Sequence, residues 1–180
     1  WPCFVVDNPI YETIPSASYP TQLGKLIPSW LITNAGISGY SSINWFDNQY
    51  SLYDFSTKDV FILELGYNGG LNPAEENTVG TTAYAYKQIV SGARSQNSSL
   101  KIFLVLSSNN INSDSWVDLL ESLSSSYDCQ ILDLRNRKFL NLSSEEFHGT
   151  YQGVMDYVHF NKRGYNAKAS FIYKEIVGLL

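Results

Sequence analysis

Apolar residues along the chain gather in five short runs, and longer stretches with helical spacing of apolar positions separate them. Short apolar runs bounded by turn residues are typical of buried parallel strands. The third run is the most apolar, so we expect it at the centre of the sheet. The predicted strands are Cys3–Asp7, Trp30–Asn34, Val60–Leu65, Lys101–Leu106 and Gln130–Leu134.

The stretches between the strands predict helices. Pro20 fits the first turn of a helix over Tyr19–Ile27, and Pro28 ends it. Further helices are predicted over Ser41–Tyr53, from Pro73 or Glu75 to Arg94, over Ser115–Leu123 and over Lys162–Leu179. Strand and helix alternate without a repeat or a linker-like break, which predicts an α/β fold. We expect one domain over residues 1–180, a three-layer α/β/α, flavodoxin-like arrangement with a five-stranded parallel sheet and helices on both faces.

Composition narrows the class of protein. A chain of 180 residues with 44% hydrophobic and 16% charged residues is large and apolar enough to bury a core. The net charge of −5 argues against nucleic-acid binding, which needs a basic face. No apolar run approaches the roughly 20 residues that span a bilayer. The start at Trp1 suggests a mature fragment or an excised domain, and abundant Asn, Ser and Tyr favour an extracellular or cell-surface location.

The spacing of the cysteines and histidines predicts neither a disulfide nor a metal site. Cys3 and Cys129 start strands that are not neighbours in the expected sheet, so we expect no disulfide between them. No Cys/His cluster has metal-ligand spacing, and no glycine-rich loop is suited to a phosphate, so neither a metal nor a cofactor is predicted. Asn97 and Asn141 each begin a glycosylation sequon, which matters only in a eukaryotic secretory context.

Four loops are expected at the carboxyl ends of the predicted strands. They span residues 8–18, 35–41, 66–72 and 151–161. The carboxyl ends of parallel strands share one edge of the sheet, and doubly wound folds bind their ligands there. The last loop carries Asp156 and His159 as an Asp-x-x-His pair. A carboxylate at this spacing can accept a hydrogen bond from one ring nitrogen and leave the other free to take a proton.

Three segments resemble, in this order, the motifs of the SGNH/GDSL hydrolase family: SYPTQLGKLIPSWLITNAGISGYSS, LELGYNGG and DYVHFNKRGY. That family comprises esterases, lipases, carbohydrate O-acetylesterases and related acyltransferases, and the resemblance covers nearly the whole chain. It implies that His159 is the general base and then the general acid, and that Asp156 orients it. It also implies that the Gly39 N–H and the Asn68 amide stabilise an oxyanion. The structural alternatives are turn roles for Gly39 and Asn68, and helix capping for Asp156 beside a partly buried His159.

The nucleophile position departs from the family pattern. The family carries Gly-Asp-Ser at the end of the first strand, whereas this chain reads Val6-Asp7-Asn8-Pro9. An amide has no hydroxyl to form an acyl-enzyme, so Asn8 cannot serve by the usual route. Ser16 and Ser18 are the alternative nucleophiles, although Ser18 also fits the start of the first helix. The simultaneous loss of glycine at Val6 favours natural divergence over a deliberate change.

Four aromatic residues flank the predicted site and suit a sugar ring, with core packing as the alternative: Tyr40, Tyr67, Tyr151 and Phe160. The first hypothesis is an ester hydrolase or acyltransferase acting on O-acyl, chiefly acetyl, groups of a carbohydrate, with a small-molecule or glycan ester as substrate. The second is a catalytically impaired domain that binds a glycan or a protein partner. A flavin or nucleotide module is disfavoured, because the loop after the first strand lacks the glycines and hydroxyls that a phosphate needs.

Overall fold

A computed structural model describes residues 6–7, 12–13, 18–37, 39–66, 68–69, 72–106, 113–135 and 162–178. The chain divides into two compact units. The first spans Gly39–Asp133, and the second combines Pro2–Ser38 with Leu134–Leu180. The expectation of a single domain stays a prediction.

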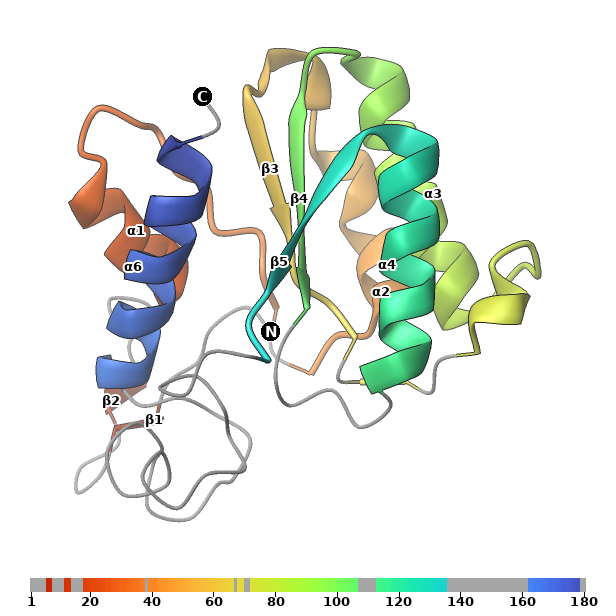
Figure 1. Cartoon of the computed structure of the whole chain (residues 1–180), viewed down its shortest axis with the longest axis horizontal. Coiled ribbons are helices and arrows are strands. Elements are labelled where there is room, and N and C mark those ends of the chain that lie inside the picture. The colour runs from red at the N-terminus through yellow and green to blue at the C-terminus, as the bar shows by residue number, and fades with distance from the viewer. Residues whose placement is uncertain are drawn as a thin grey trace. The chain divides into compact units, whose positions relative to one another are not determined.

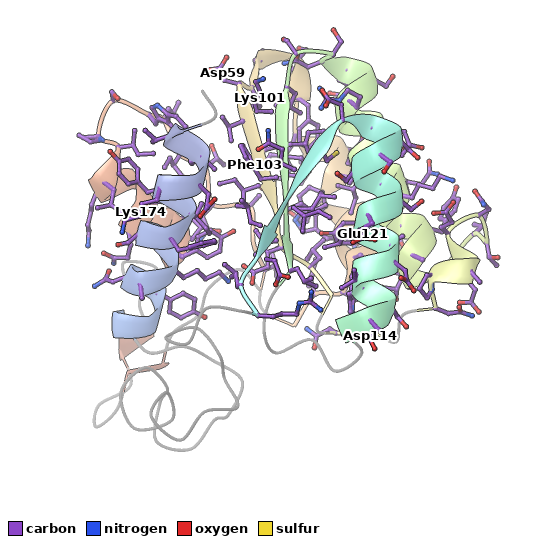
Figure 2. The ribbon with its side chains drawn as sticks, viewed as in Figure 1. Asp59, Lys101, Phe103, Asp114, Glu121 and Lys174 are labelled. Atoms are coloured by element: carbon purple, nitrogen blue, oxygen red, sulfur yellow. The ribbon has the colours of Figure 1, made fainter. Side chains whose placement is uncertain are left out.

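The first unit is built on an open, parallel sheet of strands β3 (Val60–Leu63), β4 (Lys101–Leu106) and β5 (Cys129–Asp133). Their order is β3-β4-β5, and β4 is paired on both sides (Figure 1). Residues from Ile102 to Leu106 are buried, which fits a strand covered on both faces. Figure 2 shows Asp59 and Lys101 together at the amino end of β3 and β4, where the Lys101 N–H donates to the Asp59 carbonyl.

Three helices lie on one side of this sheet: α2 (Ser42–Asn48), α3 (Thr82–Gln96) and α4 (Ser113–Tyr127) (Figure 1). Short 3-10 turns lie between the elements, η2 (Tyr50–Leu52) and η3 (Phe55–Thr57) before β3 and η4 (Pro73–Glu75) before α3. The apolar stripes of α3 and α4 are fully buried, as amphipathic helices on a sheet require. Their most buried members are Tyr86, Ile89, Val90, Ala93, Trp116, Leu119, Leu120 and Leu123.

The second unit contains α1 (Tyr19–Leu26) packed on α6 (Lys162–Val177), and a short antiparallel ribbon of β1 (Val6–Asp7) and β2 (Glu12–Thr13). Tyr19 and Leu23 of α1 are buried, as are Tyr165, Ala169 and Ile172 of α6. The buried Lys168 ammonium lies 4.8 Å from the centre of the Tyr19 ring, which is a cation–π contact between the two helices.

The prediction of five parallel strands is wrong for the described part of the chain, where the parallel sheet has three. Trp30–Asn34 is irregular, with Leu31 98% exposed and the Trp30 N–H donating to the Ile27 carbonyl in a turn. Within the predicted Cys3–Asp7 strand, the described pair Val6–Asp7 runs antiparallel to β2. An apolar run predicts burial but does not supply a neighbouring strand. The central strand is β4 and not β3, because β4 alone pairs on both sides. Helices on both faces of the sheet stay a prediction.

Each predicted helix is present, but the bounds differ from the prediction, by up to nine residues at the start of α3. Helix α1 ends at Leu26, one residue before the prediction. The helix expected over Ser41–Tyr53 ends at Asn48 and continues as the 3-10 turn η2. Helix α3 begins only at Thr82, because Gly80 has a left-handed φ of 84° and Thr81 caps the helix by accepting a bond from the Tyr84 N–H.

Candidate active site

Gly39 lies on the loop that enters α2. Its φ of 78° is a left-handed value that favours glycine, and a Cβ built there meets no atom within 4 Å. The loop is then fixed by a capping box, in which Ser41 Oγ accepts from the Asn44 N–H and Asn44 Oδ1 accepts from the Ser41 N–H, both at 3.2 Å. The result is an exposed Gly39 with open space where a side chain would lie, followed by a turn that the capping box fixes.

Asn68 lies on the loop that follows β3. Its side chain is half-buried, and Nδ2 donates to the Tyr40 carbonyl at 3.4 Å. This bond joins two loops that are 28 residues apart in the sequence, and it brings Asn68 beside the residue that follows Gly39. The Asn68 amide carries two hydrogens, and the Tyr40 carbonyl takes one of them.

The starts of α2 and α3 hold these two loops. The Ser42 hydroxyl donates to the Thr82 carbonyl at 3.0 Å, and both residues are buried. A Cβ at Gly69 lies 3.0 Å from Thr82 Oγ1 and 3.5 Å from the Cβ of Ser41. Gly69, one residue after Asn68, is therefore in close contact with both helix starts.

A buried layer lies behind the Asn68 loop. Gly66 has a φ of 129°, and a Cβ there collides with the indole of Trp116 from α4. The Trp116 ring packs edge-on to Tyr86, with 5.5 Å between centroids, and the Tyr86 hydroxyl donates to the Leu63 carbonyl at 3.4 Å. Burial, and next the charge of the nearby Glu64 carboxylate, raises the pKa of the Tyr86 phenol well above its ordinary 10.0. Tyr86 is therefore a neutral packing residue and not an acid or base at ordinary pH.

The other predicted site residues divide into two groups. Tyr40 is half-buried, and its carbonyl accepts the bond from Asn68. Ser18 is buried and caps α1, because its hydroxyl accepts from the Thr21 N–H at 3.4 Å. The Ser18 hydroxyl also bonds the Thr21 hydroxyl at 2.9 Å. Seven predicted residues lie outside the described part of the chain: Asn8, Ser16, Tyr67, Tyr151, Asp156, His159 and Phe160.

Three supporting residues were not predicted from the sequence: Ser42, Thr82 and Trp116. The capping pattern Ser41-x-x-Asn44 marks the start of α2, but it does not show that Ser42 bonds to Thr82. Trp116 is one apolar position on an amphipathic helix, and its contact with Gly66 depends on how α4 packs. These contacts are long-range, so no local pattern indicates them.

Within the described ranges, no cluster of three or more His, Cys, Asp or Glu side chains could hold a metal ion. The helices described here are also all too short or too polar to cross a bilayer.

The described residues define an α/β fold with an open parallel sheet and helices. Comparison with protein-family models gives no match, and comparison with curated proteins gives none either. Among solved structures, the chain is similar to a possible lipase from Chitinophaga pinensis, with a TM-score of 0.67 and 17% identity over 89% of this chain and 88% of that one. It is also similar to a second crystal structure, with a TM-score of 0.69 and 14% identity over 91% and 86% of the two chains. At these identities, the likeness is one of fold.

Proposed function

We propose that this chain is an SGNH-type ester hydrolase or acyltransferase that acts on O-acyl groups, chiefly acetyl groups of a carbohydrate. The observation that carries the proposal is the hydrogen bond from the Asn68 amide to the Tyr40 carbonyl. This bond joins the loop of Gly39 to the loop of Asn68, which supports a shared role for the two loops. The order of the three sequence motifs and the fold likeness to a possible lipase support the same class of activity.

In the proposed mechanism, the Gly39 N–H and the second Asn68 amide hydrogen donate to the oxygen of the ester carbonyl as it becomes negative. One such donor lowers the barrier by about 2.7–4 kcal/mol. His159, oriented by Asp156, removes the proton from the attacking hydroxyl and returns it to the leaving alkoxide.

Asn8 stands where the family has its attacking serine, so the nucleophile must come from another residue. Of the two alternative serines, Ser18 has a buried hydroxyl engaged with Thr21, so its use requires the first turn of α1 to open. Ser16 is the better candidate on this ground, and it must lie within hydrogen-bond reach of His159.

The test is hydrolysis of p-nitrophenyl acetate and of an acetylated glycan, with His159→Ala as the diagnostic variant. The chain has two histidines, so His148→Ala is a matched control. We expect turnover that His159→Ala abolishes and His148→Ala preserves. Turnover that survives His159→Ala would contradict the assigned base, and its absence in the unmodified chain leads to the second candidate.

The second candidate is a catalytically impaired SGNH-like domain that binds a glycan or a protein partner, and Asn8 favours it. A fluorophosphonate probe followed by peptide mapping separates the two. Labelling at Ser16 or Ser18 supports the hydrolase. An unlabelled chain that binds an acetylated glycan more tightly than the deacetylated form supports the impaired domain.

A further inference from the structure

Trp116 packs against Gly66, on the loop that carries Asn68. It is 2% exposed, and its indole atom Cε2 lies 2.8 Å from the position of a Cβ at Gly66, two residues before Asn68. The six-membered ring of the indole therefore fills the place that a side chain at position 66 would occupy.

The indole is itself held in place. Tyr86 of α3 packs against it in an edge-to-face arrangement, with 63° between the ring planes, and Tyr86 is fully buried. The Tyr86 hydroxyl in turn donates to Leu63 at the end of β3. Tyr86 of α3 thus packs on the indole, and the backbone at Gly66 meets its six-membered ring.

The opposite end of the same loop is fixed separately, at Gly69, by Thr82 and Ser41. Asn68 stands between the two anchor points, and its own bond to the Tyr40 carbonyl is long, at 3.4 Å. A bond of that length constrains the amide weakly, so the packing at the two ends of the loop must set its position.

The geometry points to Trp116 as a positioning residue that holds Asn68 at the oxyanion position, an inference that rests on the proposed function. The residue does not touch the substrate. It acts through Gly66, because loss of the indole edge lets the loop move toward α4. A displacement of about 1 Å in a catalytic group can cost up to ~100-fold in rate.

The test compares Trp116→Phe with Trp45→Phe. Both tryptophans are buried, at 2% and 4% exposure, and both substitutions remove the same indole atoms. Trp45, on α2, stacks on Tyr53 with 5.7 Å between ring centroids. The Trp45→Phe variant therefore controls for the general cost of a cavity. Hydrogen–deuterium exchange is followed on a peptide over residues 64–72.

We expect exchange in that peptide to rise about tenfold or more in Trp116→Phe and to stay near the unmodified rate in Trp45→Phe, since only the first opens space beside Gly66. Equal protection in the two variants would overturn the inference.

Turnover provides the second readout, in whichever form hydrolyses p-nitrophenyl acetate, the unmodified chain or Asn8→Ser. We expect Trp116→Phe to lower kcat between ~10-fold and ~100-fold with KM little changed, because the loss is confined to the transition state. An unchanged kcat overturns the inference and leaves the proposed function intact. If neither form turns over, the proposed function fails, and the exchange experiment still decides whether Trp116 fixes the loop.

Discussion

At the scale of single residues, Asn97 begins a glycosylation sequon, but its side chain has a structural role in the fold. Asn97 lies in the turn after α3, and both polar atoms of its side chain form hydrogen bonds there. Nδ2 donates to the carbonyls of Phe55 and Lys58 at 3.3 and 2.8 Å, and Oδ1 accepts from the Ser99 N–H at 3.0 Å. A glycan on Nδ2 would remove at least one of these bonds.

We therefore predict that Asn97→Ala lowers the free energy of unfolding by about 2 kcal/mol or more, because four side-chain hydrogen bonds worth roughly 0.5–1.5 kcal/mol each are lost. Urea denaturation measures the change. Ser98→Ala is the control, since Ser98 is exposed and lies in the same turn. Equal midpoints for the two variants would show that the Asn97 bonds do not stabilise the fold.

At the scale of elements, Arg94 connects the end of α3 to the turn between α4 and β5. Its guanidinium donates to the carbonyls of Tyr127 and Asp128 at 2.9 and 2.8 Å, and to those of Ser98 and Leu100 at 2.8 and 2.7 Å. Asp128 has a left-handed φ of 51°, which makes this turn a costly one to form. One planar side chain thus satisfies the carbonyls of two separate turns.

We predict that Arg94→Lys destabilises the protein by about 2 kcal/mol, because a lysine ammonium has the charge but not the fork of donors that reaches four carbonyls. Arg94→Met, which removes the charge as well, is expected to cost at least as much. A stability within about 0.5 kcal/mol of the unmodified protein for Arg94→Lys would mean that charge alone is sufficient.

The elements also show what a hydrophobic pattern determines. The runs at β3, β4 and β5 were located to within two residues, because each run pairs with a neighbouring strand of the same sheet. Trp30–Asn34 is also an apolar run but forms no strand, because strand formation needs a partner that local sequence does not supply. The late start of α3 follows from Gly80 and Thr81, which are visible in the sequence.

At the scale of the whole molecule, stability at alkaline pH depends on a buried thiol. Burial raises the pKa of Cys129, a free cysteine on β5, from 9.0 to about 11. Between those values the unfolded chain loses the thiol proton and the folded chain keeps it. The contribution to stability is thus fully present below pH 9 and is lost as pH rises toward 11.

We predict that Cys129→Ala flattens the fall in unfolding free energy between about pH 9 and pH 10, measured by urea titration at each pH. Tyr86 acts in the same direction, mainly above its ordinary pKa of 10.0, and it is present in both proteins, so the difference between their slopes reports the thiol. Identical slopes for the variant and the unmodified protein would refute the assignment.

The candidate site was predictable only in part, because a local sequence pattern does not show contacts between distant segments. Gly39 and Asn68 were selected because their segments resemble the SGNH/GDSL motifs, and the structure brings their loops together. The residues that fix those loops, Ser42, Thr82 and Trp116, act through contacts between distant segments. The Asp156–His159 pair and the Asn8 position lie outside the described residues, and their roles stay predictions.

The most direct test of the oxyanion site is the rate of p-nitrophenyl acetate hydrolysis by Asn8→Ser, combined with Val6→Gly, with and without Asn68→Ala. We predict hydrolysis above background for the restored nucleophile, and a drop of about 10²–10³ in kcat when the Asn68 amide is removed. Asn48→Ala is the control, since its exposed amide donates to a carbonyl within α2, at 2.9 Å. Background rates with the restored serine, or rates that Asn68→Ala leaves unchanged, would contradict the account.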